Sequence, residues 1–157
     1  MAAMDITDLV TPETILSGLR CKDKKQLLQE MSGIAAPLLS VPVGDLFEAL
    51  LQRERLGSTA VGRGIAIPHC RLSRSKSVRC LFARLDTPLE FAAPDGEPVD
   101  LVFLLVAPED AGADHLKALA CISRTMRDPA LCSKLRSVKS TKGIYAVLSE
   151  YVSRPAA

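Results

Sequence analysis

An eight-residue segment at 99–106 restricts the fold of this chain more than any other part of it. It reads Val-Asp-Leu-Val-Phe-Leu-Leu-Val and is apolar at every position except Asp100. A strand of this kind is buried on both faces, so the sheet that contains it needs a covering layer on each side. The sequence therefore predicts an α/β fold, a single-domain α/β sandwich in which helices flank a mixed β-sheet on both sides.

Helical and strand-like spacing in the rest of the chain supplies the other elements of such a sandwich. We expect helices over residues 22–39, 44–55, 113–127, 128–137 and 141–152. We expect further strands near residues 14–19, 65–69 and 78–85. The segment 86–100 contains three prolines and a Pro-Asp-Gly turn sequence, which predicts a hairpin-like connection. No linker divides the chain, so residues 1–157 are expected to form one domain.

Charge and hydropathy argue against two classes of partner. The formal net charge is +2, which is too small for the basic field of a nucleic-acid-binding protein, so we expect no nucleic acid. No window approaches 18 uninterrupted apolar residues, so we expect no membrane insertion. The N-terminus carries early acids and lacks a basic segment before an apolar one. We therefore infer no signal peptide and expect a cytoplasmic protein.

The cysteines do not form a recognisable framework. There are five of them, at positions 21, 70, 80, 121 and 132. The number is odd and no CxxC pair occurs, so we expect neither a disulfide framework nor a cysteine-rich zinc site. Four are interpreted as small packed hydrophobic residues. Cys70 is distinguished from the others because it directly follows a histidine.

A glycine-rich segment that ends at that histidine, His69, is the first candidate site. Ile65 and Ile67 alternate with smaller residues, and this strand-like spacing places His69 where a short strand ends. Arg53, at the start of the segment, continues the core-facing stripe of the preceding helix, so its guanidinium needs an anion or hydrogen-bond acceptors. Alternatively, Arg53 interacts with the C-terminal dipole of the helix or extends to water.

The only other histidine, His115, is expected in the first turn of the helix over 113–127, on its apolar face. The positive end of a helix disfavours imidazolium, so His115 would stay neutral and can donate one N–H to an anion. The alternative is a histidine that is satisfied at the edge of the core. If the strand at 65–69 is a parallel neighbour of the central strand, His69 and His115 lie at the same rim of the sheet.

Two histidines and an arginine at one rim suit an anion better than a metal. A zinc triad lacks its third histidine, although Asp110 and Asp114 leave a metal site open as an alternative; we expect no metal and no cofactor. The chain has no G-x-S-x-G motif of a serine hydrolase and no Walker A motif. Neutral imidazole attacks phosphoryl groups, and arginine matches their oxygens, so these residues favour phosphoryl transfer.

The segments that carry this chemistry are similar to a known signature. Arg-Glu-Arg-Leu-Gly-Ser-Thr at 53–59, followed by Gly-Ile-Ala-Ile-Pro-His at 64–69, resembles the active-histidine segment of the fructose/mannitol-type enzyme IIA family. These proteins are phosphoryl carriers of the phosphoenolpyruvate-dependent phosphotransferase system. Further similar segments lie at 8–12, 94–105 and 107–119, so the resemblance spans nearly the whole chain. It is strongest to the nitrogen-regulatory branch, and the family fold agrees with the predicted sandwich.

The resemblance implies a role for each candidate residue. His69 would be phosphorylated at Nε2, giving a tele-phosphohistidine, while Arg53 would stabilise the phosphoryl charge. His115 would help to hold the phosphoryl group. Thr59 lies in the matching hydroxyl-bearing segment and would form a hydrogen bond near the site.

Two positions depart from the family pattern. Cys70 stands where the family commonly has glycine. We interpret it as a harmless packed thiol, and the alternative is a thiol that crowds the donor interface or adds redox sensitivity. Arg63 stands where the mannitol-type branch has an acid and the regulatory branch often has asparagine. A positive charge at Arg63 is expected to favour binding of the anionic phosphoryl group, and it argues against the mannitol-type branch.

The resemblance implies a regulatory phosphocarrier, more a carrier than a free-standing enzyme. An HPr-like phosphocarrier protein would be the donor, and target proteins of nitrogen or potassium regulation, such as potassium-transport regulators or sensor kinases, would receive the signal. An alternative is a sugar-specific IIA component that passes the group to a IIB domain; the lack of a fused HPr, IIB or membrane segment favours the regulatory role. An interaction module that accepts no phosphate is disfavoured because Arg53, His69 and His115 are all present.

Overall fold

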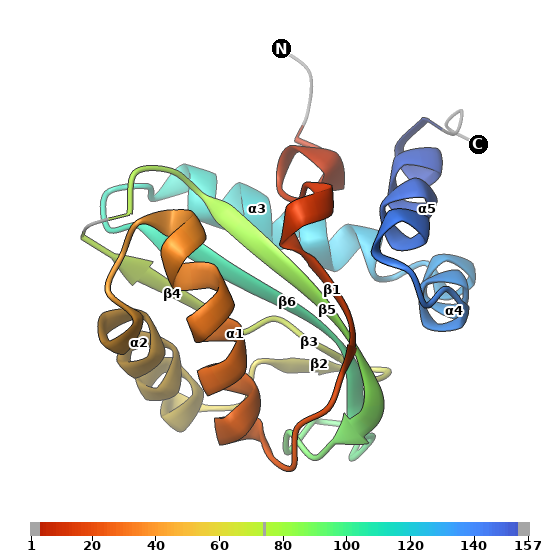
Figure 1. The fold of residues 1–157 in the computed structure, drawn as a ribbon, viewed down its shortest axis with the longest axis horizontal. Coiled ribbons are helices and arrows are strands. Elements are labelled where there is room, and N and C mark those ends of the chain that lie inside the picture. The colour runs from red at the N-terminus through yellow and green to blue at the C-terminus, as the bar shows by residue number, and fades with distance from the viewer. Residues whose placement is uncertain (1–3, 74, 154–157) are drawn as a thin grey trace.

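The computed structural model describes residues 4–73 and 75–153 (Figure 1). Within them, two short 3-10 helices, Ile6–Asp8 and Pro12–Thr14, precede the sheet. The strands are β1 (Ile15–Leu19), β2 (Ala60–Gly62), β3 (Ile65–Ala66), β4 (His69–Leu72), β5 (Arg79–Leu89) and β6 (Val99–Pro108). The α-helices are α1 (Lys24–Leu39), α2 (Val43–Leu56), α3 (Ala113–Thr125), α4 (Pro129–Ser137) and α5 (Thr141–Ser153). All five expected helices are therefore confirmed.

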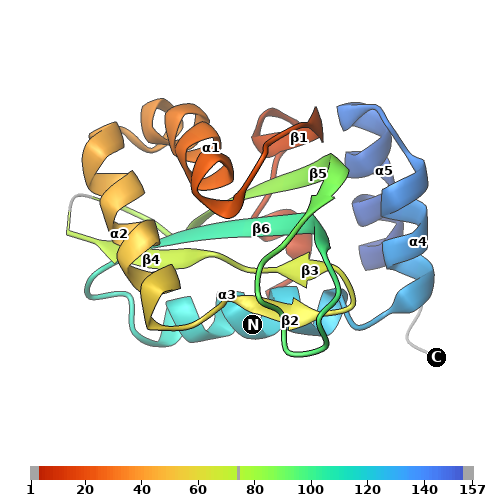
Figure 2. The ribbon, with the colours of Figure 1, turned by 90° about the horizontal axis from the view of Figure 1, so that it is seen from below.

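The strands form one mixed sheet with the order β1-β5-β6-β3-β2, and β4 also pairs with β6. β5 and β6 are antiparallel, whereas β1 runs parallel to β5, and β3 and β4 run parallel to β6. Helices α1 and α2 cover one face and α3 covers the other, with α4 and α5 beside it (Figures 1 and 2). The predicted α/β sandwich is confirmed.

The central strand β6 is buried on both faces, as its apolar run predicts. Val102 and Val106 belong to the hydrophobic cluster beneath α1 and α2, whereas Phe103 and Leu105 belong to the cluster beneath α3, α4 and α5. All four side chains are buried. Each additional buried side chain of this size contributes roughly 1.5–3 kcal/mol relative to an exposed one, so both helical layers are needed to stabilise β6.

The predicted strand at 65–69 is interrupted, and His69 begins β4 where we expected it to end a strand. β3 stops at Ala66, and the ladder resumes when His69 pairs with Leu105. The cause is Pro68, which has no N–H to donate and breaks the regular ladder. Across the break, the Ile67 N–H donates to the Thr59 carbonyl at 3.0 Å. The carbonyl of Ile67 lies at this break, between the end of β3 and the start of β4.

The parallel arrangement that would bring the two histidines together is confirmed. β4 runs parallel to β6, and α3 begins five residues after β6 ends, so the start of α3 lies at the same rim as β4. Among the described residues, no helix combines the length and the apolar character that crossing a bilayer requires.

Candidate phosphoryl-transfer site

The structure brings together Arg53 from the last turn of α2, His69 from the start of β4 and His115 from the first turn of α3. They surround a surface hollow of about 440 Å³. The full lining consists of Ala49, Gln52, Arg53, Leu56, His69, Cys70, Arg71 and His115. Because α2 and α3 cover opposite faces of the sheet, the hollow lies where both helical layers meet the free edge of β4.

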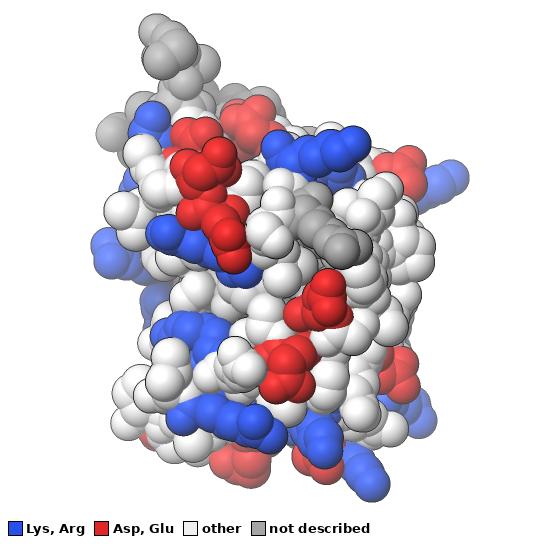
Figure 3. Space-filling model, turned by 90° about the vertical axis from the view of Figure 1, so that its left-hand side faces the viewer, with Lys and Arg blue, Asp and Glu red and all other residues white. Residues whose placement is uncertain are grey.

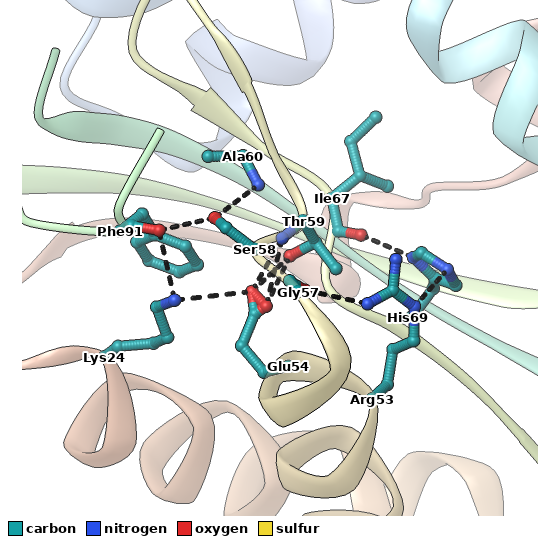
Figure 4. Close-up of polar contacts among 10 residues, drawn as sticks. All are labelled: Lys24, Arg53, Glu54, Gly57, Ser58, Thr59, Ala60, Ile67, His69 and Phe91. Carbon is teal, nitrogen blue, oxygen red and sulfur yellow. Dashed lines mark hydrogen bonds and ion pairs between the residues drawn. The ribbon is translucent and has the colours of Figure 1, made fainter. Parts of the chain in front are cut away.

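The imidazole of His69 is held in one tautomer. Its Nδ1 lies 2.8 Å from the carbonyl oxygen of Ile67. A carbonyl can only accept, so Nδ1 carries the proton and Nε2 keeps its lone pair. Arg53 Nε donates to that Nε2 at 3.3 Å, and Arg53 Nη1 donates to the carbonyl of Gly57 at 2.8 Å (Figure 4). The free nitrogen of His69 is therefore presented beside a guanidinium.

His115 is held in the opposite tautomer by a residue that the sequence analysis missed. Arg71 Nε donates to His115 Nδ1 at 2.8 Å. A guanidinium has no acceptor, so the proton of the neutral ring resides on Nε2. That Nε2 is buried and has no hydrogen-bond partner among the described residues. A buried donor without an acceptor is costly, and because His115 borders the hollow, an anion bound there is the candidate acceptor.

The two rings are close enough to act on one small group. Their centroids lie 5.7 Å apart with an interplanar angle of 71°. His69 contributes an acceptor nitrogen, and His115 contributes an N–H donor. Arg53 and Arg71 add two positive charges on either side. The combination suits a tetrahedral anion that is bonded to one imidazole and hydrogen-bonded by the other.

The surroundings of both histidines favour the neutral form of the ring. Burial lowers the pKa of His69 from its ordinary value of 6.5; its hydrogen bond to Ile67 opposes this shift, the Arg53 charge adds to it, and the Glu54 charge opposes it. Burial also lowers the pKa of His115, and the charges of Arg71 and His69 lower it further. A neutral Nε2 is the nucleophilic form of imidazole.

These depressed pKa values predict an acid-sensitive fold. Below about pH 6.5 the unfolded chain binds protons at both positions before the folded chain does, so the free energy of unfolding falls as the pH decreases towards the folded-state pKa values. Urea unfolding between pH 7.5 and 5.5 measures this slope. A His69→Gln/His115→Gln double variant is expected to show a flatter slope. An equal slope in both proteins would show that other groups control the acid response.

Two further sequence candidates do not line the hollow. The hydroxyl of Thr59 donates to the Glu54 carboxylate at 2.6 Å, on the inner side of α2. Arg63 lies in the β2–β3 turn, and its Nη1 donates to the carbonyl of Arg127 at 3.3 Å. It lines a separate hollow that includes Asp100, at the start of β6, whereas His69 pairs with Leu105. Five residues of strand correspond to about 16 Å, so the geometry does not support Arg63 as a phosphoryl ligand.

The remaining sequence candidates are also accounted for by their positions. Cys70 points into the cluster beneath α1 and α2, and burial raises the pKa of its thiol to about 12. It is therefore a protonated, packed side chain at neutral pH. All five cysteines are free and buried. Asp110 and Asp114 line a different hollow, together with Lys76. Within the described part of the chain, no three potential metal ligands gather at one point.

Comparison with known proteins agrees with the fold and the geometry. The chain belongs to the family described as phosphoenolpyruvate-dependent sugar phosphotransferase system, EIIA 2, whose model matches residues 8–151. The resemblance inferred from the sequence is thus confirmed.

Several of the similar proteins are nitrogen regulatory proteins. The chain is 56% identical over 146 residues to the nitrogen regulatory protein of Bradyrhizobium diazoefficiens, covering 93% of this chain and 95% of that protein. It is 36% identical over 154 residues to the nitrogen regulatory protein of Escherichia coli K12, covering 97% and 94%. The crystal structure of nitrogen regulatory protein IIA-Ntr from Neisseria meningitidis is similar with a TM-score of 0.86 and 34% identity, over 91% of this chain and 98% of that one.

Proposed function

We propose that this protein is a regulatory phosphocarrier of the phosphotransferase system. His69 accepts a phosphoryl group at Nε2 from an HPr-like protein, and the phosphorylation state is reported to target proteins. One observation carries the proposal: the Nδ1–H of His69 is committed to the Ile67 carbonyl, so the lone pair of Nε2 lies beside Arg53 at the hollow. The high identity to nitrogen regulatory proteins supports the regulatory role over a sugar-specific one.

The transfer step follows from these positions. A bond forms between Nε2 of His69 and the phosphorus, the bond from phosphorus to the donor breaks, and its electron pair leaves with the donor. Phosphoryl transfer needs positioning and charge stabilisation more than proton transfer. Arg53 supplies a guanidinium for the phosphoryl oxygens, and His115 supplies its Nε2–H. Arg71 keeps the His115 proton on the side of the hollow by occupying Nδ1.

The rim of the hollow favours a protein donor. Leu56, which lines the hollow, is 85% exposed, and Leu116, next to His115, is 64% exposed. Exposed leucines around a functional group are typical of a protein–protein contact. Figure 3 shows the face on which α2 and the end of β4 lie, where basic and acidic side chains are interspersed around an uncharged area. Such a surface suits a small folded partner better than a polyanion.

The signal to target proteins follows from the negative charge that the phosphoryl group adds. A phosphoryl group on His69 adds roughly two negative charges at the rim of the hollow, which is enough to switch an interface without refolding the domain. We propose that the whole chain, residues 1–157, acts as one IIA domain in the cytoplasm. Its targets would be proteins of nitrogen or potassium regulation, such as potassium-transport regulators or sensor kinases.

Phosphorylation in vitro tests the proposal. With phosphoenolpyruvate, enzyme I and an HPr-like carrier, the chain is expected to gain one acid-labile phosphate, which ³¹P and ¹⁵N NMR would locate on Nε2 of His69. A protein that gains no phosphate, or gains it elsewhere, would defeat the proposal. Affinity capture with the phosphorylated and unphosphorylated forms then tests the signal, since equal sets of partners would remove the regulatory role.

Replacement of His115 is expected to affect how long the phosphoryl group stays on His69 more than whether His69 accepts it. His115→Ala removes the N–H donor at the hollow but leaves Nε2 of His69 and Arg53 in place. We expect slower transfer and a phosphohistidine lifetime shortened by roughly 10-fold, because one charge-assisted hydrogen bond is worth about 1.5 kcal/mol. Quench-flow labelling and the decay of the ³¹P signal measure the two quantities. If neither changes, His115 is only a structural residue.

A further inference from the structure

A buried carboxylate lies directly beside the proposed site and takes no part in the chemistry described so far. Glu54 follows Arg53 in the last turn of α2, but its side chain points inward and is only 3% exposed. Both carboxylate oxygens accept from the Thr59 N–H, at 3.0 and 3.1 Å. They also accept from the Thr59 hydroxyl, at 2.6 and 3.0 Å.

One cation from the neighbouring helix compensates this charge. Lys24 Nζ of α1 lies 3.8 Å from the Glu54 carboxylate and donates to the carbonyl of Phe91 at 3.1 Å. The same ammonium lies 4.7 Å from the centroid of the Phe91 ring. Burying such a pair is expensive, and well-packed apolar residues often serve stability equally well. The Lys24–Glu54 pair is therefore better explained by the geometry that it imposes on its neighbours than by a contribution to the stability of the fold.

Two short paths lead from Glu54 to the reacting groups, the first from its carboxylate and the second from its main-chain carbonyl; Figure 4 draws the residues of both. Along the first, Thr59 is fixed by Glu54, the Thr59 carbonyl accepts from the Ile67 N–H at 3.0 Å, and the Ile67 carbonyl accepts from His69 Nδ1 at 2.8 Å. Along the second, the Gly57 N–H donates to the Glu54 carbonyl at 3.2 Å, and the Gly57 carbonyl accepts from Arg53 Nη1 at 2.8 Å.

The turn between α2 and β2 is also held at a second point. Ser58 Oγ donates to the carbonyl of Phe91 and accepts from the Ala60 N–H at 3.1 Å. Lys24 binds that same Phe91 carbonyl, so the turn, α1 and the segment before β6 share one polar cluster. Movement of this cluster would withdraw the acceptors of Arg53 and His69 together.

We propose that Glu54 is a positioning residue of the phosphoryl-transfer site. Its carboxylate, held by Lys24 and Thr59, fixes the turn that aims Arg53 and sets the tautomer of His69, without touching the phosphoryl group. The inference rests on the proposed function. A displacement of about 1 Å at a reacting group can cost up to 10²-fold in rate, so a buried group at this distance can control transfer.

The first arm of the test needs no phosphoryl transfer. Histidine-selective ¹⁵N labelling of the unphosphorylated full chain gives the tautomer of His69 from its two nitrogen shifts. Wild-type protein is expected to hold the proton on Nδ1. Glu54→Gln, which keeps the shape and removes the charge, is expected to raise the fraction with the proton on Nε2. The exposed Glu30→Gln of α1 is the matched control and is expected to match wild type.

The second arm measures transfer from the phosphorylated HPr-like carrier. Glu54→Gln is expected to lower the maximal rate by about 10-fold and to leave KM for the donor within about twofold, because Glu54 is buried and does not reach the donor. A merely structural role would lower the melting temperature while the tautomer and the rate at 25 °C stayed at wild-type values. That result in a folded Glu54→Gln protein would overturn the proposal.

Thr59 provides a second test if Glu54→Gln does not fold. Thr59→Val is close in shape to threonine and removes only the hydroxyl bond to Glu54, whereas Thr59→Ser keeps it. We expect the valine variant to shift the His69 tautomer and slow transfer, and the serine variant to restore both. Equal behaviour of the two variants would refute the positioning role. If wild-type protein accepts no phosphate at all, the proposed function fails. The His69 tautomer in the Glu54 and Thr59 variants still tests whether the Glu54 hydrogen bonds position the ring.

Discussion

Substitution of alanine for His69 is expected to reduce phosphate incorporation from phosphoenolpyruvate to below about 1% of wild type, since no other group at the hollow can serve as the acceptor. The remaining ring nitrogen of His115 carries the proton and is not a nucleophile, because Arg71 donates to the other nitrogen. Cys70 points into the core with a pKa of about 12, so it provides no thiolate. The loss therefore reflects removal of a single nucleophile.

Radiolabel incorporation at saturating donor measures this effect, and circular dichroism establishes that the variant is folded. The matched comparison is His115→Ala, which removes the other imidazole and is expected to incorporate phosphate more slowly than wild type without abolishing it. Labelling that persists in folded His69→Ala protein would assign the acceptor to another residue and remove the basis of the proposed function.

Replacement of Arg53 by methionine is expected to slow transfer to His69 by about 10²-fold while the fold stays close to native. Methionine keeps an apolar stem similar to that of arginine but has no guanidinium to face the phosphoryl oxygens. Because Arg53 Nε lies 3.3 Å from Nε2 of His69, it is close to the place where charge develops. The substitution also releases the carbonyl of Gly57, which is partly exposed to water.

Rapid-quench kinetics at several donor concentrations separates this loss into rate and affinity. Arg55→Met is the matched control, because Arg55 lies two residues further along α2 and is exposed. Both substitutions remove one positive charge from the same helical turn, so a general electrostatic effect on the donor would appear in both. Equal rates for the two variants would mean that Arg53 has no specific role in transfer.

Periodicity was sufficient to predict most of the architecture. The apolar run at 99–106 required two covering layers, and helical spacing located α1 to α5 within a few residues. Strand ends were less predictable because pairing partners decide them. β5 continues to Leu89 despite Pro88, since Leu89 pairs with Val99 after a shift in register. The short β2 has only three residues and exists because it pairs with β3.

Site residues could be predicted only where the residue spacing within a single helix or strand pointed to them. Arg53 and His115 each occupy the inner face of a helix, and His69 follows a glycine-rich approach, so local spacing was enough to identify them. Arg71 lies two residues beyond His69, on the same side of β4, and a strand expected to continue past His69 would have indicated it. Glu54 gave no such signal, because its partners Lys24 and Thr59 come from other elements.

The orientation of His69 depends on a main-chain atom, the carbonyl oxygen of Ile67 at the break between β3 and β4. A point mutation changes a side chain and leaves such an oxygen in the chain. The apolar rim at Leu56 and Leu116, by contrast, consists of side chains that mutation can replace one at a time. A protein built in this way can exchange its partners over evolutionary time and still present the same ring nitrogen to each of them.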